Sequence, residues 1–143
     1  MRRLIGVAAA LAALACDDQS YREIRTAIDI VARRDEAVAA PSREQLIGFG
    51  RRALPQIETA LHTAPEKGRL ALIGVLDHMA DAEAAPVLRH FAVYDASAEV
   101  REACETVLWS WAKVPGLRGE RAREAVARVV EQRGRGEGPL PPR

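Results

Sequence analysis

The stretch Ala53-Leu54-Pro55-Gln56-Ile57 recurs farther along the chain as Ala84-Ala85-Pro86-Val87-Leu88, and Arg69-Leu70-Ala71 recurs as Arg101-Glu102-Ala103. The two prolines lie 31 residues apart and the two arginines lie 32 residues apart, so the period is fixed except for one residue in the intervening turn. A period in this range is typical of stacked supersecondary units, none of which can bury its apolar face alone. We therefore expect an all-α fold, a short right-handed α-solenoid of helical hairpins.

The flanking sequence predicts further helices of the same solenoid. Ser20 and Glu23 form a capping box that indicates a helix start, Pro41 indicates a break, and Ser42 with Gln45 indicates a second start. Later helix starts are signalled by a proline or a capping residue, at Pro55, Pro65, Asp81 and Ser97, and Pro115-Gly116 predicts the last turn. The solenoid is expected to cover residues 20–133, and the Gly- and Pro-rich residues 134–143 are expected to form a disordered tail.

The composition is that of a single ordinary globular domain. The chain has 143 residues, of which 48% are hydrophobic and 29% are charged. Removal of residues 1–15, which include Arg2 and Arg3, would leave 21 − 2 = 19 basic side chains against 20 acidic ones, a net charge of −1. Nucleic-acid binding needs a basic surface, so this balance predicts that no nucleic acid is a partner.

The amino terminus has the pattern of an export signal. Met1-Arg2-Arg3 is basic, and the apolar run from Leu4 to Leu14 has 11 residues, whereas a membrane span needs roughly 20. A short apolar run after a basic start is typical of a signal peptide, here residues 1–15. The following Cys16 resembles the acylated cysteine of bacterial lipoproteins, which implies lipidation of Cys16 and an anchor and linker over residues 16–19.

Two alternatives to the lipoprotein interpretation stay open at this point. Ala13-Leu14-Ala15 also fits an ordinary A-x-A cleavage site, which would release a soluble periplasmic protein, and the run could instead be a cytoplasmic helix. In the lipoprotein interpretation, Asp17 resembles the sorting signal that retains lipoproteins in the inner membrane. Several acyl chains on one residue give a stable anchor. The expected location is then the cell envelope, on the periplasmic face of the inner membrane.

Residues 44–112 resemble the short HEAT-like repeats that also occur in relatives of phycobilisome lyases. The resemblance is carried by Gly50-Arg51-Arg52-Ala53-Leu54-Pro55, Pro65-Glu66-Lys67-Gly68-Arg69, Asp81-Ala82-Glu83-Ala84-Ala85-Pro86 and Asp95-Ala96-Ser97-Ala98-Glu99-Val100-Arg101-Glu102-Ala103. It implies an aspartate that caps each turn, a proline that starts each outer helix, and a V-R-x-A sequence that starts each inner helix. Gly68 departs from this pattern, since it takes the place of the valine. Lyase activity belongs to a minority of such proteins, and a soluble periplasmic lyase-like or accessory factor is the alternative function.

Catalytic and metal-binding motifs are not apparent in the sequence. Gly48 to Ala53 matches a G-x-G-x-x-A dinucleotide motif only nominally, because a helix is predicted where that motif needs a strand. The three histidines show no ligand spacing, and Cys104 falls among apolar residues at helical spacing, as a buried side chain would. We therefore expect no enzyme activity, no cofactor and no metal.

Protein binding is the function that the repeat pattern favours, because a solenoid offers an extended recognition surface. Trp109 lies about 200° around its helix from Trp111, which belongs to the apolar stripe. Trp109 is thus either an exposed contact residue or packed beneath the closing helix 117–133, and the sequence leaves both possibilities open. The repeat spacing places Glu66, Lys67, Glu99 and Glu102 near inner-helix starts, where they could share a binding face with Trp109. The expected role is a membrane-anchored, non-catalytic scaffold that binds another protein.

Overall fold

Helices make up most of the described chain. The computed structural model describes the backbone of residues 2–139 and the side chains of residues 18–139, so the predicted lipidation and sorting residues, Cys16 and Asp17, lie outside the described side chains. The α-helices are α1 (Arg2–Arg33), α2 (Glu36–Phe49), α3 (Leu54–Leu61), α4 (Glu66–Met79), α5 (Ala85–Tyr94), α6 (Ala98–Ala112) and α7 (Leu117–Gly134). Two short 3₁₀ segments, η1 (Gly50–Ala53) and η2 (Ala82–Ala84), precede α3 and α5. Residues 2–139 contain no strand, which confirms the all-α prediction.

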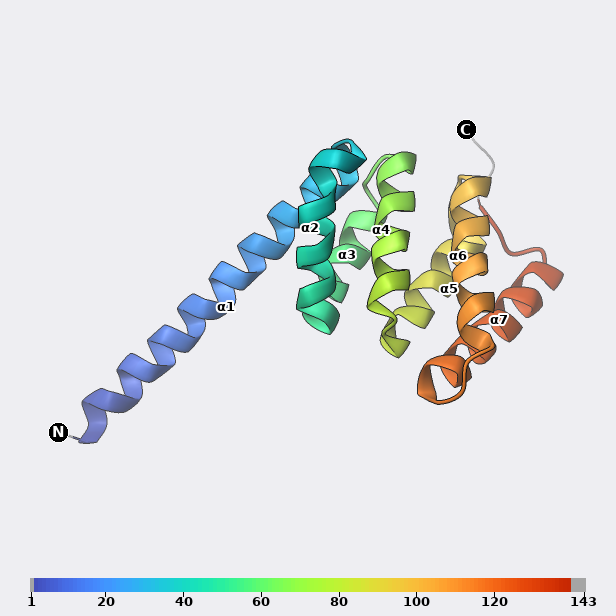
Figure 1. Cartoon of the computed structure of the whole chain (residues 1–143). Coiled ribbons are helices and arrows are strands. Elements are labelled where there is room, and N and C mark those ends of the chain that lie inside the picture. The colour runs from blue at the N-terminus through green and yellow to red at the C-terminus, as the bar shows by residue number, and fades with distance from the viewer. Residues whose placement is uncertain (1, 140–143) are drawn as a thin grey trace.

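The helices pack in two rows. In Figure 1, α2, α4 and α6 lie side by side, with α3 and α5 behind them, and the amino-terminal part of α1 extends away from this body. One continuous apolar core fills the space between the rows. Its largest fully buried side chains are Leu46, Ile57, Leu61, Leu72, Leu76, Leu88, Leu108, Val75, Val93, Val100 and Cys104. Every helix from α2 to α6 contributes to that set, so the stacking of neighbours is what buries the apolar faces.

The two repeats seen in the sequence have the same local structure. Each begins with a 3₁₀ turn and continues into a helix with proline in its first turn, Pro55 in α3 and Pro86 in α5. The repeated arginines also correspond: Arg69 Nη1 donates to the carbonyl of Ala64 at 2.8 Å, and Arg101 Nη1 donates to that of Ala96 at 3.1 Å. In both units, therefore, an arginine in the first turn of the front-row helix donates a hydrogen bond to a carbonyl of the loop that precedes that helix.

Polar contacts join neighbouring units. Arg51 donates two hydrogen bonds of 3.1 Å to the carboxylate of Asp81, and this contact holds the pKa of Asp81 below its usual range. The indole of Trp111 donates to Asp77 at 2.9 Å, which connects α6 with α4. These hydrogen bonds join elements that also share the apolar core, so they add polar contacts to the apolar packing between neighbouring units.

A buried ion pair ties α4 to the turn before α6. Arg69 Nη2 donates to Asp95 Oδ1 at 3.0 Å, and Arg69 Nε lies 2.9 Å from Asp95 Oδ2, a close charge contact rather than an aligned hydrogen bond. Asp95 also accepts the backbone N–H of Ser97 at 2.8 Å, so its charge is paired and hydrogen-bonded where it is buried.

The capping predictions hold in the second half of the chain. Asp81 accepts the N–H of Glu83 at 2.9 Å at the start of η2, and Ser97 Oγ accepts the N–H of Val100 at 3.3 Å at the start of α6. Gly116, with φ of 84°, occupies the turn before α7, a conformation that favours glycine.

The predicted helix start at Ser20 is wrong. α1 runs without interruption from Arg2 to Arg33, and Ser20 lies inside it. Glu23 accepts a hydrogen bond from the side chain of Gln19 at 2.9 Å instead of capping Ser20, and Arg22 pairs with Asp18. Such contacts four residues apart stabilise a helix that continues through this position, and the preceding alanine-rich sequence has high helix propensity.

The predicted break at Pro41 is also wrong, and with it the start at Ser42. Pro41 lies within α2, which begins at Glu36. An interior proline removes one backbone hydrogen bond and costs about 3 kcal/mol. Burial of Ala39 and Leu46 on either side of Pro41 holds α2 together as one helix against that cost.

The chain turns back after α7. Tyr94 Oη, at the end of α5, donates to the carboxylate of Glu137, and Gln132 Nε2 donates to the same carboxylate at 3.1 Å. The predicted tail, residues 134–143, overlaps α7 at Gly134, the last residue of that helix, and includes Glu137, which makes these contacts. Residues 140–143 lie outside the described part. No helix within the described residues has both the length and the apolar character needed to cross a membrane.

Candidate functional site

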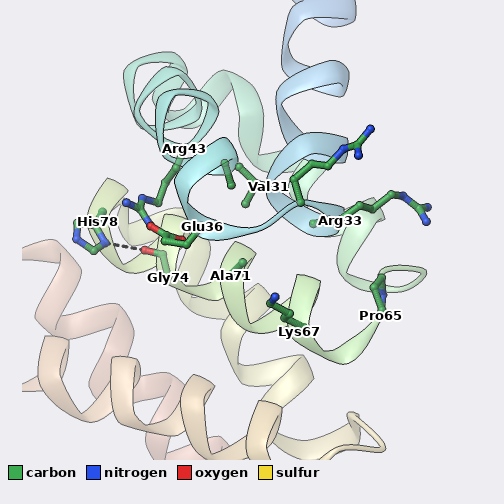
Figure 2. A pocket seen from close by; sticks show the side chains of 12 residues that line it. Val31, Arg33, Glu36, Arg43, Pro65, Lys67, Ala71, Gly74 and His78 are labelled. Carbon is green, nitrogen blue, oxygen red and sulfur yellow. Dashed lines mark hydrogen bonds and ion pairs between the residues drawn. The ribbon is translucent and has the colours of Figure 1, made fainter.

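An open groove separates α2 from α4 at the end of α1 and has a volume of about 620 Å³ (Figure 2). Its apolar lining is made of small or short side chains, Val31, Ala39, Ala71 and Gly74 among them. Basic side chains surround this lining, namely Arg33 and Arg34 at the end of α1, Arg43 on α2 and Lys67 on α4. Glu36 is the acidic residue of the lining. The groove therefore combines an apolar floor with a basic rim.

Weak ion pairs hold part of the basic rim. Arg43 pairs with Glu36, and Lys67 Nζ lies 3.3 Å from Asp35, where both side chains are more than four-fifths exposed, at 81% and 90%. An exposed pair of this kind contributes little to stability and is easily exchanged for another partner. The side chain of Arg34 has no hydrogen bond or ion pair with any described side chain. The rim therefore retains positive charge that the chain itself does not neutralise.

Gly74 lies in the middle of α4 on the floor of the groove. A Cβ atom at this position would have no heavy atom within 4 Å. Glycine in a helix interior costs roughly 1 kcal/mol relative to alanine, and close packing within this chain does not explain its presence. His78 Nδ1, one turn later, donates to the Gly74 carbonyl at 2.8 Å, as the dashed line in Figure 2 shows. The result is a smooth helix surface that another chain can approach closely.

A second surface surrounds Trp109 on α6. Its side chain is 53% exposed, which decides between the two possibilities left open by the sequence in favour of a solvent-facing position. Trp109 lines one hollow with Val126 and Val130 of α7 and another with Glu102 and Thr106 of α6. Val130 is itself 64% exposed. Trp109 therefore rests against the closing helix without being covered by it.

The other predicted contact residues fall in different places. Glu102 joins Trp109 on α6, where Lys113 and Glu105 complete the surroundings. Lys67 belongs to the groove between α2 and α4 instead. Glu66 and Glu99 are exposed in the first turns of α4 and α6, and Glu99 and Glu102 have no side-chain partner among the described residues. The predicted single face is thus two surfaces, one mainly basic and one of mixed charge, since Lys113 and Arg133 lie near Trp109 and Arg133 pairs with Glu105.

Sequence reasoning missed most of the groove. Arg34, Arg43 and His78 were not predicted as contact residues, because the groove forms only where α4 packs beside α2 and the end of α1, which precede it by about 20 residues or more of chain. The available signal was Gly74, a glycine inside the apolar run from Leu70 to Leu76 in the middle of α4.

Histidines and aromatic rings gather on the back row. The rings of His62 and His90 lie 5.5 Å apart between centroids, and Phe91 and Tyr94 contact them. Burial and the neighbouring His62 lower the pKa of His90. No group of three or more metal-ligating side chains occurs within residues 18–139.

Comparison of the chain with protein-family models, with curated proteins and with solved structures gives no match.

Proposed function

We propose that this chain is a non-catalytic, HEAT-like α-solenoid that binds another protein while a lipid on Cys16 holds it at the membrane. The observation that carries the binding role is the exposure of Trp109, 53% of a large aromatic side chain, on the front row of helices. Buried aromatic anchors supply much of the binding energy of protein interfaces. Glu102, an exposed carboxylate near Trp109 without a side-chain partner among the described residues, favours a partner with a basic group beside an apolar pocket, whereas Glu105 is paired with Arg133.

The solenoid arrangement is part of the same proposal. It is supported by the repeated 3₁₀ turn and Pro-containing helix, by the equivalent arginine contacts of Arg69 and Arg101, and by the row of α2, α4 and α6. The address proposed for it is the periplasmic face of the inner membrane, with Asp17 as the sorting residue. An anchored solenoid would present its front row at a fixed distance from the membrane, where membrane proteins or their soluble domains are the accessible partners.

Trp109→Ala tests the binding role. We expect the variant to retain less of the partner that the wild-type chain captures from native membranes, by at least roughly 30-fold in affinity, because an aromatic anchor is worth 2 kcal/mol or more. The melting temperature should stay nearly unchanged, because the side chain is exposed. Tyr21→Ala is the matched control, since Tyr21 is 54% exposed on α1. Equal loss in both variants, or a large fall in melting temperature for Trp109→Ala, would contradict the proposal.

A further inference from the structure

We propose that the groove between α2 and α4 receives Trp109 of a second copy of this chain, so that two copies form a closed dimer through their front rows. This inference rests on the proposed binding role of Trp109 and names its partner. It starts from the two surfaces described above. One is a hollow with a small-residue floor and a basic rim, and the other is an exposed aromatic ring with the unpaired Glu102 on the same helix.

Shape supports the match between the two surfaces. The groove has a volume of about 620 Å³ and a floor formed in part by Ala71 and by Gly74, above which there is open space. An indole ring is desolvated when it enters a hollow of this size. Because Gly74 has no Cβ atom, the ring could approach the backbone of α4 closely there. Glycine at position 74 is explained if another copy packs there, whereas the single chain offers no contact that would explain it.

Charge supports the same match. Arg34 on the groove rim and Glu102 beside Trp109 have no side-chain partner within the described part of the chain. Lys67 is engaged only in an exposed pair with Asp35. Insertion of Trp109 would bring Glu102 towards these cations, and complementary charges around an apolar contact set the register of an interface. Lys113, the basic residue of the α6 surface, would then lie on the opposite side of the ring, away from the rim.

The arrangement of the helices allows the contact to be made twice. α4 lies between α2 and α6 in the front row (Figure 1), with the groove on its α2 side and α6, the helix that contains Trp109, on its other side. Two copies related by a two-fold axis across α4 would place each Trp109 over the groove of the other copy. Such an interface is isologous and closes on itself, so it ends at a dimer instead of growing into a filament. A standard interface buries about 800 Å² on each partner, a small part of the 9200 Å² surface of the chain.

The test measures the mass of the full chain in solution by analytical ultracentrifugation over a range of protein concentrations. We expect the wild type to approach twice 15.6 kDa, and added salt to weaken the dimer because exposed charges are screened. Trp109→Ala should raise the dimer Kd by at least roughly 30-fold. Gly74→Leu should also give a monomer, because its side chain fills the groove, while the melting temperature stays the same or rises through better helix propensity.

Charge reversal provides the second arm. Arg34→Glu and Glu102→Arg should each weaken the dimer, and the double variant should restore it, which a general loss of folding cannot do. A monomeric wild type overturns the inference. Association that persists in Trp109→Ala and in Gly74→Leu also overturns it, because the contact would then come from another segment, such as the apolar residues 4–14. If the wild type is monomeric but Trp109→Ala still loses a membrane partner, the dimer is wrong and the proposed function stands.

Discussion

Two glycines of the same helix have opposite structural roles. A Cβ atom at Gly68 would lie 2.4 Å from the carbonyl oxygen of Ala32, where α4 crosses the end of α1, whereas a Cβ at Gly74 would meet nothing within 4 Å. The difference also accounts for the departure of Gly68 from the repeat pattern. A valine at this position would collide with the backbone of α1, which has no equivalent beside Arg101 in the later repeat.

Substitution of the two glycines by alanine should therefore change stability in opposite directions. We expect Gly68→Ala to lower the free energy of unfolding by about 1–3 kcal/mol, because backbone must move to admit the methyl group. Gly74→Ala is the matched control and should raise it by up to about 1 kcal/mol through helix propensity. Urea denaturation of both variants measures the difference. A similar change in both would mean that α1 and α4 do not approach each other this closely.

Cys104 is expected to be chemically inert in the folded chain. It is fully buried in α6, and burial raises the pKa of its thiol to about 12. Since the thiolate is the reactive form, at pH 8 its reaction with a disulfide reagent should be roughly 10³-fold slower than that of an exposed thiol. The measurement uses Cys16→Ser, which leaves Cys104 as the remaining cysteine. Rapid reaction without denaturant would contradict the packing of α6, and reaction in urea should follow unfolding.

At the scale of helices, α3 and α5 meet through their histidines. Burial, the charge of His62 and that of Arg89 lower the pKa of His90, whereas Glu58 acts weakly in the other direction. Tyr94 contacts the same ring from one turn later. Protonation of His90 is thus less favourable in the folded chain than in the unfolded chain, where its ordinary pKa is 6.5.

Stability should fall as the pH falls below 6.5. In this window the unfolded chain binds a proton at His90 that the folded chain does not, so the free energy of unfolding decreases with decreasing pH. Thermal melting between pH 7.5 and 5 measures the decrease, and His90→Gln should make it smaller. His78→Gln is the control, since His78 is exposed on the front row. An unchanged pH dependence in His90→Gln would show that the contact between α3 and α5 does not control this titration.

How far the sequence predicts the helices depends on whether their signals are local. The caps at Asp81 and Ser97 and the first-turn prolines of α3 and α5 require only neighbouring residues, and the structure confirms them. The start of α1 and the continuity of α2 through Pro41 were predicted wrongly. In each case the local sequence pattern favours a helix end, but other interactions stabilise a continuous helix. These are contacts between residues four apart in α1 and burial of apolar side chains in α2.

The candidate surfaces show the same division. The angle between Trp109 and the apolar stripe of α6 follows from helical geometry. The exposure of Trp109 depends on how closely α7 packs against α6, and no local sequence pattern determines that packing. The groove between α2 and α4 brings together Arg34 from the turn after α1, Arg43 from α2 and Lys67 from α4. The relative placement of those helices is set by the core, and therefore only the structure reveals the groove.

At the scale of the whole molecule, one half of α1 packs on the helical body and the other half projects from it. The second half of α1 packs on α2 and α4 through Ile24, Ile28 and Val31, whereas its first half extends from the body of the protein (Figure 1). The predicted cleavage before Cys16 would divide this helix and leave Ile24, Ile28 and Val31 in the part that packs on the body.

Processing at Cys16 is the prediction that fixes the location of the molecule. We expect mass spectrometry of the protein from bacterial membranes to find an amino terminus at Cys16 carrying acyl chains, and Cys16→Ser to abolish the modification. Because several acyl chains hold a protein stably on a membrane, the wild type should fractionate with membranes and Cys16→Ser should not. Asp17→Ser is the control for sorting, since it should keep the lipid but move part of the protein out of the inner-membrane fraction. An unmodified amino terminus at Cys16 would instead support a soluble periplasmic protein, and retention of residues 1–15 would leave the chain unprocessed.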